Sequence, residues 1–208
     1  MSSLQQRKTY HVGNLEEQII LDAKKMLEQV GVHKLSIRAV AEHIGISATA
    51  IYYHFSNKDE LLNHLAMAGF KQLEKELKCC LSNESDEHPL KKIGKGYLNF
   101  ASQHPALYQL MFSAPSASLS AQLVMARKNA YQVFENCIAD MLGERANPKS
   151  IRTTALAGWS FTHGLSSLVI HDALDLPRKY SNDELIERTF LGLEQFMLSY
   201  LGHDQQSV

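Results

Sequence analysis

The chain has 208 residues, of which 45% are hydrophobic and 21% are charged, and its formal net charge at pH 7 is −1. This composition excludes a disordered chain and is typical of a globular protein that buries a core without disulfides. The charge balance excludes a broad basic surface, because even residues 1–58 hold only seven Lys or Arg against five Asp or Glu.

Cysteine usage and the N-terminal sequence bear on the compartment. Cys79 and Cys80 are adjacent and poorly placed to bridge each other, and Cys137 lies far away, which suits a reducing environment. The N-terminus lacks the apolar run of a signal peptide, and no stretch approaches the roughly 18 apolar residues of a membrane span. We therefore expect a cytoplasmic protein.

The first predicted elements are an arm and a helix. Residues 1–13 are polar and lack a helical period, which predicts a flexible arm. Arg7 and Lys8 in this arm could touch a phosphate backbone, although a solvated tail is the simpler interpretation. A stripe of apolar residues then predicts a helix that Asn14 caps and Gly31 ends.

Two short helices joined by a tight turn are predicted between Ser36 and Lys58, in the run SIRAVAEHIGISATAIYYHFSNK. Ser36 is a good cap for the first helix, and Gly45 can enter the left-handed conformation that the turn requires. Ser47 caps the second helix, which extends to about His54.

The second short helix has an unusual outer face. Its apolar residues are used in packing, so Ala48, Thr49, Tyr52, Tyr53 and His54 remain outside. Small residues at the start let the backbone approach a DNA groove, and the Thr49 hydroxyl or methyl can meet a base edge. The hydroxyl and imidazole groups at the other end suit phosphate oxygens.

Two cations flank this helix. Arg38 projects from the start of the first short helix and could reach a guanine edge or a phosphate, and Lys58 starts the next helix, where free N–H groups also attract phosphate. An ordinary three-helix core with a polar face is the alternative, but it leaves adjacent tyrosines followed by His and Phe unexplained. The pattern predicts a helix-turn-helix in the DNA major groove.

The rest of the chain is also helical by its apolar period, so the fold class is all-α with about nine helices. A long helix over residues 57–81 follows the helix-turn-helix directly and can enter the next domain. The remaining predicted segments are helices over residues 89–103, 105–112, 119–142, 149–173 and 183–201, and then a tail, 202–208.

The run LSIRAVAEHIGISATAIYYHFSNKDELL resembles the N-terminal DNA-binding region of the TetR family of bacterial transcriptional regulators, over about residues 14–65. The resemblance implies an all-α homodimer, usually a repressor, that binds a palindromic double-stranded DNA operator and pairs through its last two long helices. By matched position it implies DNA contacts at Ser36, Arg38, Ala48, Thr49, Tyr52, His54 and Lys58. Ala48 is too short for a polar base contact.

The resemblance also sets the expected domains. Residues 14–58 would form the DNA-binding domain, and residues 59–201 a ligand-binding and dimerisation domain, with helix 57–81 as the link. A small-molecule effector among the middle helices would tilt that link and change the spacing of the two DNA-reading helices.

A second motif lies at Gly158–Leu165, GWSFTHGL. Its W-x-x-x-H-G pattern, together with PALYQLMF at residues 105–112, resembles a C-terminal regulatory domain of one branch of the family, named for Trp, His and Gly. Trp159 and His163 share a helix face, and Gly164 would let another helix pack closely. A packed Trp beside a hydrogen-bonded core His is an equally good interpretation. The predicted effector pocket consists of Phe100, Tyr108, Met111, Phe112, Phe134, Trp159 and His163.

The sequence thus predicts a homodimeric repressor that an effector releases from its operator. A DNA-binding regulator without an effector is the first alternative. A small helical enzyme is disfavoured, because there is no nucleophile elbow, phosphate loop or dinucleotide fingerprint. Adjacent thiols such as Cys79 and Cys80 can bind soft metals or arsenicals, but a buried apolar thiol is the simpler interpretation. No cofactor or metal is expected.

Overall fold

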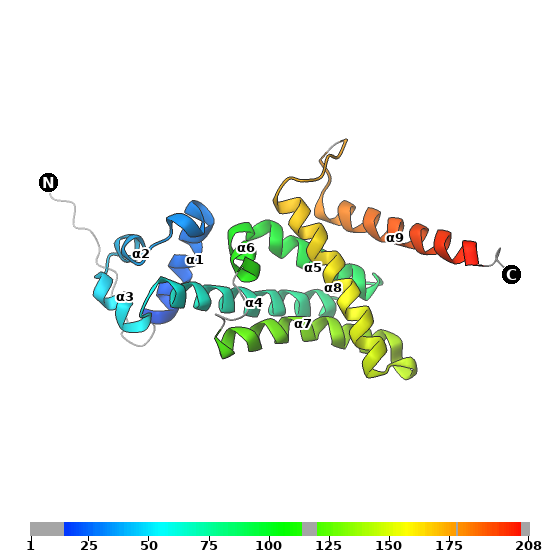
Figure 1. Cartoon of the computed structure of the whole chain (residues 1–208), viewed down its shortest axis with the longest axis horizontal. Coiled ribbons are helices and arrows are strands. Elements are labelled where there is room, and N and C mark those ends of the chain that lie inside the picture. Colours follow the sequence, from blue (N-terminus) through cyan, green and yellow to red (C-terminus); the bar gives the residue numbers. More distant parts are fainter. Residues whose placement is uncertain (1–14, 114–119, 178, 205–208) are drawn as a thin grey trace. The chain divides into compact units, whose positions relative to one another are not determined.

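The computed structural model describes residues 15–113, 120–177 and 179–204, with side chains as far as Gln195. These residues form nine α-helices and a short 3-10 helix and contain no strand, which confirms the all-α prediction (Figure 1). The predicted arm 1–13, the predicted cap of the first helix, Asn14, and the end of the predicted tail lie outside the described residues. The helices are α1 (Leu15–Lys34), α2 (Ile37–Ile44), α3 (Ala48–His54), α4 (Lys58–Ser82), α5 (Pro89–Gln103), α6 (Pro105–Ser113), α7 (Ala121–Leu142), η2 (Gly143–Arg145), α8 (Pro148–Ile170) and α9 (Asn182–Asp204).

The caps predicted for the helix-turn-helix are present. Ser36 Oγ accepts a hydrogen bond from the Ala39 amide at 3.2 Å, and Ser47 Oγ accepts one from the Ala50 amide at 3.1 Å. Gly45 ends α2 in the left-handed conformation, with φ 82°. Ser36 fixes where α2 begins, and Gly45 and Ser47 fix where α2 ends and α3 begins, so the direction of α3 is set locally.

Gly31 interrupts α1 where the sequence predicts its end. Its backbone is non-helical, with φ 73° and ψ 167°, a conformation that L side chains rarely adopt. One further helical turn, up to Lys34, follows this break before α2 begins.

The chain divides into two compact units. The N-terminal unit consists of residues up to Gly69 together with Ala106–Leu123, and the C-terminal unit of Phe70–Pro105 together with the chain from Val124 onward. Helices α1, α2 and α3 gather around the start of α4 (Figure 1). The core of the N-terminal unit is formed by fully or almost fully buried Ile19, Ala23, Leu27, Leu35, Ile37, Val40, Ala41, Ile51, Phe55, Leu61 and Leu65.

The C-terminal unit packs α5 against α8 and α9. Two glycines of α5 permit close packing. A Cβ at Gly96 would lie 2.7 Å from Cys80 Sγ, and one at Gly94 would lie 3.2 Å from Ile186 Cδ1. At Gly164 no described atom of the chain lies within 4 Å of a Cβ position, and this glycine lines an open groove (below). Close packing of another helix at Gly164 stays a prediction.

Within the described residues, no helix has the length and apolar character that crossing a membrane requires.

Candidate nucleic-acid interface

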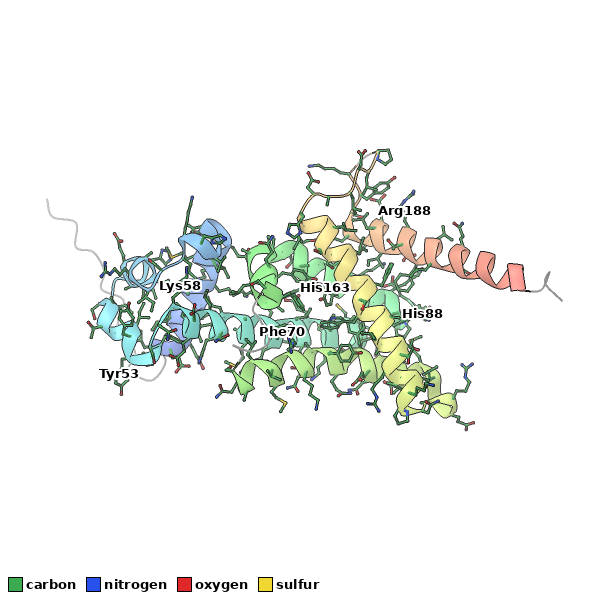
Figure 2. The ribbon with its side chains drawn as sticks, in the orientation of Figure 1. Tyr53, Lys58, Phe70, His88, His163 and Arg188 are labelled. Atoms are coloured by element: carbon green, nitrogen blue, oxygen red, sulfur yellow. The ribbon has the colours of Figure 1, made fainter. Side chains whose placement is uncertain are left out.

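The outer face of α3 is unusually rich in exposed aromatic side chains. Tyr53 is 86% exposed and Tyr52 is 50% exposed, whereas Ile51, on the inner face of α3, is fully buried. Thr49 is also exposed, and Ala48 is half-buried. Figure 2 shows Tyr53 at the free edge of α3, directed away from the helices behind it. Apolar packing thus holds α3 from behind and leaves hydroxyl groups on the outer face.

Ser36 and Arg38 lie at the start of α2. Arg38 is exposed, so its guanidinium is accessible to an anion. The Ser36 hydroxyl already accepts the Ala39 amide hydrogen, which leaves its own O–H to donate to a phosphate oxygen.

His54 at the end of α3 faces a carboxylate. Its Nδ1 lies 3.9 Å from Glu16 Oε2, and His64 Nδ1 lies 3.7 Å from Glu16 Oε1. Glu16 is in α1 and His64 in α4, so one side chain from each of three helices meets at the end of α3. Sequence reasoning missed Glu16 and His64, because nothing in their spacing signals that these helices bring them together.

Lys58, one of the predicted DNA contacts, is bound to the protein's own backbone. Its ammonium donates a hydrogen bond to the Val32 carbonyl oxygen at 2.9 Å, and the residue is half-buried. Two further N–H groups of the ammonium remain to bind another acceptor. Lys58 therefore has a partner within the protein that the sequence did not predict.

The start of α4 is closed by reciprocal caps. Asn57 Oδ1 accepts the Glu60 amide at 2.9 Å, and Glu60 Oε2 accepts the Ser56 amide at 2.7 Å. The hydrogen bond from Ser56 lowers the pKa of the Glu60 carboxyl. These bonds fix the residue at which α4 begins.

Three of the predicted pocket residues meet in the C-terminal unit. The Trp159 ring meets Phe134 edge to face, with centroids 5.2 Å apart, and it contacts Tyr97 in the same way at 5.2 Å. His163 Nδ1 lies 3.2 Å from the Tyr97 hydroxyl oxygen. Burial lowers the pKa of His163, which favours a neutral imidazole. Sequence reasoning missed Tyr97, which lies in the apolar stripe of α5 and has no motif of its own.

The other four predicted pocket residues are divided between the two compact units. Phe100 is in the C-terminal unit, where its ring contacts His104 at 5.4 Å. Tyr108, Met111 and Phe112 belong to the N-terminal unit, and the rings of Tyr108 and Phe112 lie 5.0 Å apart. Neither compact unit therefore contains the whole predicted set.

Helices α8 and α9 carry apolar surface that the single chain leaves open. Leu156 is 60% exposed on α8, and Leu191 is 55% exposed on α9. A groove of about 520 Å³ lies between these helices. Its lining is mostly apolar and includes Phe161, Leu165, Leu168, Leu174, Leu176 and Leu185.

The adjacent thiols differ in environment. Cys79 is exposed, whereas Cys80 is half-buried and burial raises the pKa of its thiol. Across the part of the chain that the structure describes, no group of three or more His, Cys, Asp and Glu could hold a metal ion.

Comparison with known proteins covers both halves of the chain. Residues 19–65 match the profile of bacterial regulatory proteins of the tetR family, and residues 90–193 match the tetracyclin repressor-like C-terminal domain. The second match is consistent with the regulatory domain predicted from Trp159, His163 and Gly164.

Individual relatives agree with these matches. The chain is 42% identical over 52 residues to the class C tetracycline repressor protein of Escherichia coli, a segment that covers 25% of this chain and 24% of that protein. It is 27% identical over 157 residues to an uncharacterised HTH-type transcriptional regulator of Mycobacterium tuberculosis, covering 74% of this chain and 64% of that protein. The chain thus spans about a quarter of the tetracycline repressor that it matches.

A solved structure extends the likeness to the whole fold. A protein of unknown function from Rhodococcus sp. RHA1 superimposes with a TM-score of 0.73 at 27% identity, over 88% of this chain and 95% of that one. The capped helix-turn-helix with its exposed tyrosines, the helical C-terminal region and both profile matches lead to one conclusion. The chain belongs to the TetR family of DNA-binding bacterial transcriptional regulators.

Proposed function

We propose that this chain is a transcriptional repressor that binds a palindromic operator as a homodimer in the bacterial cytoplasm and leaves it when a small molecule binds. The observation that carries the proposal is the outer face of α3, where Tyr52 and Tyr53 are exposed on a helix held rigidly from behind. Exposed aromatic side chains at a monomer surface point to a partner. The hydroxyls of these two residues suit phosphate oxygens, which position a protein on duplex DNA.

The DNA contacts we propose are the residues predicted from the sequence. Thr49 faces the bases and Ala48 allows the backbone to approach, while Tyr52, Tyr53 and His54 contact the backbone. Ser36, Arg38 and Lys58 supply donors on either side of α3. With few cations on this surface, one subunit alone binds weakly, and the operator needs two half-sites about 34 Å apart or somewhat more.

A second copy of the chain is the partner we propose for α8 and α9. The groove beside Leu165 and Leu168 is lined mostly by apolar side chains, and Leu191 is exposed on the neighbouring helix. Symmetric pairing would cover the same apolar patch on both subunits, as isologous dimers do. Pairing of this kind fixes the distance between the two copies of α3.

Release by an effector is the third part of the proposal. Helix α4 runs from Lys58 to Ser82 without a break, and its residues belong to the N-terminal unit up to Gly69 and to the C-terminal unit from Phe70. A ligand that binds beside Trp159 and His163 would act on the second part of this helix and reach the DNA-binding part through it. The ligand-binding residues that we propose are the seven predicted from the sequence.

A second candidate is a DNA-binding regulator without an effector. It is favoured by the close ring contacts around Trp159, since edge-to-face packing with Tyr97 and Phe134 is what a core without a ligand contains. Under this candidate, the pair formed by Tyr97 and His163 serves stability alone.

The test begins with selection of duplexes from a random-sequence library by the purified protein. The proposal expects a palindromic consensus and a complex of two chains on one duplex, measured by light scattering. Recovery of no preferred duplex would contradict it. A screen of small molecules for release of the selected duplex then separates the two candidates.

A further inference from the structure

The carboxylate of Glu28 in α1 binds the start of α6, a helix outside the helix-turn-helix. Glu28, a half-buried residue of α1, accepts a hydrogen bond from the Ala106 amide at Oε2 and another from the Leu107 amide at Oε1, both at 3.0 Å. Ala106 and Leu107 are the second and third residues of α6. Amides in the first turn of a helix have no partner within the helix, so Glu28 satisfies two donors that would otherwise lack one.

The charge of Glu28 suits this position. A carboxylate at a helix N-terminus is stabilised by the helix dipole as well as by the hydrogen bonds. Because both oxygens are used at once, the contact fixes the direction of α6 relative to α1 more firmly than a single hydrogen bond would.

A second contact holds α6 further along its length. Met111 Sδ lies 2.6 Å, and Leu107 Cγ 3.1 Å, from the place that a Cβ on Gly69 of α4 would occupy. Leu107 and Met111 are buried. Helix α6 is therefore attached both to α1 and to α4, and from Ala106 onward it falls in the same compact unit as α1, α2 and α3.

We propose that Glu28 is a positioning residue that couples α6 to the DNA-binding helices, so that operator binding and the order of α6 depend on each other. The chain supplies the route to the other unit, since α5 ends at Gln103 and α6 begins at Pro105. A change in α5 reaches α1 through the Glu28 carboxylate. Coupling free energies are reciprocal, so DNA bound at α3 must in turn stabilise the start of α6.

The inference rests on the proposed function, and hydrogen exchange tests it without knowledge of the effector. Exchange of the amides of residues 104–113 is followed by mass spectrometry, with and without the selected operator duplex. The proteins are the wild type, Glu28→Ala and Glu28→Gln, and Glu17→Gln serves as a control because Glu17 is exposed on the same helix.

Without DNA, the amides at the start of α6 should exchange roughly fivefold faster in Glu28→Ala than in the wild type, as loss of a helix cap predicts. Glu28→Gln should lie between them, because its amide keeps one acceptor oxygen. Operator DNA should slow this exchange in the wild type and in Glu17→Gln. In Glu28→Ala it should bind and leave the exchange of α6 unchanged.

Equal slowing by DNA in the wild type and both Glu28 variants would overturn the inference, as would wild-type α6 amides that do not respond to bound operator. If Glu28→Ala does not fold, Glu28→Gln gives the same comparison on a side chain of the same shape. Failure of every duplex to bind the wild type would instead count against the proposed function. Even then, if the α6 amides of the DNA-free Glu28 variants exchanged at the wild-type rate, the positioning role of Glu28 would be overturned.

Discussion

The ammonium of Lys58 donates a hydrogen bond to the Val32 carbonyl oxygen at 2.9 Å and thereby joins the first residue of α4 to the last turn of α1. Carbonyl groups at the end of a helix have no partner within the helix, and a cation there complements the helix dipole. Lys58 therefore has a structural role that precedes any contact with DNA.

Replacement of Lys58 by Met should destabilise the protein without DNA. The variant loses a donor to a carbonyl that is partly withdrawn from water, so the free energy of unfolding should fall by about 0.5–1.5 kcal/mol. Urea denaturation measures this change. Lys75→Met is the matched control, since Lys75 is exposed on the same helix and should change stability little. Equal stability of the two variants would show that the Val32 contact contributes nothing.

Gly69→Ala should disturb the packing of α6 against α4. The added methyl group would lie 2.6 Å from Met111 Sδ and 3.1 Å from Leu107 Cγ, so side chains must shift. Overpacking of this kind costs about 1–3 kcal/mol. The control is Gly158→Ala, where the nearest atom, Phe134 Cδ1, lies at an ordinary 3.8 Å and the helix gains a better helix former. A Gly69→Ala protein as stable as this control would contradict the packing described.

Stability should depend on pH through His163. Burial lowers the pKa of this imidazole in the folded chain, whereas histidine in an unfolded chain has a pKa of about 6.5. As pH falls below that value, the unfolded chain binds a proton that the folded chain does not. The free energy of unfolding therefore falls with pH until the folded pKa is reached.

His163→Gln should reduce this dependence, since its amide does not titrate and can still bond the Tyr97 hydroxyl. Urea denaturation of both proteins at about pH 7.5 and about pH 5.5 gives the comparison. The wild type should lose more stability between the two values than the variant does. Identical losses would assign the pH dependence to other groups.

Leu191→Glu should weaken pairing of two chains. Leu191 is 55% exposed on α9, where the proposed dimer would bury it, and a charge in an apolar interface is costly. Analytical ultracentrifugation should show dissociation of the variant at concentrations where the wild type is a dimer. Leu21→Glu is the control, because Leu21 is 54% exposed on α1, away from α8 and α9 in the sequence. The same sedimentation for both variants would place the dimer contact elsewhere.

The features that could be predicted from the sequence are those that depend on neighbouring residues. Ser36, Gly45 and Ser47 act on amides or turns within four residues, so their roles follow from local chemistry. The contacts of Lys58 with Val32, and of Glu28 with Ala106, join residues 26 and 78 positions apart. No periodicity encodes such pairs, because only the packed fold brings them together.

The predicted pocket shows the same limit. Phe134, Trp159 and His163 do meet in one unit, because each follows the apolar period of its own helix. The sequence did not reveal that Tyr97 completes the cluster, or that Tyr108 and Met111 pack in the other unit. Composition identifies side chains suited to a pocket, but it does not tell which helix faces which.

Operator affinity of α3 variants tests the central claim most directly. Tyr52→Ala and Tyr53→Ala each remove a phenol from the outer face of α3 without touching the core, so folding should be retained, and circular dichroism checks this. Affinity for the selected duplex, measured by fluorescence anisotropy at fixed salt, should fall roughly tenfold or more in each variant. Leu21→Ala, which removes an exposed side chain of the same domain, should bind as the wild type does. Unchanged affinity in both tyrosine variants would contradict the account of α3 as the DNA-reading helix.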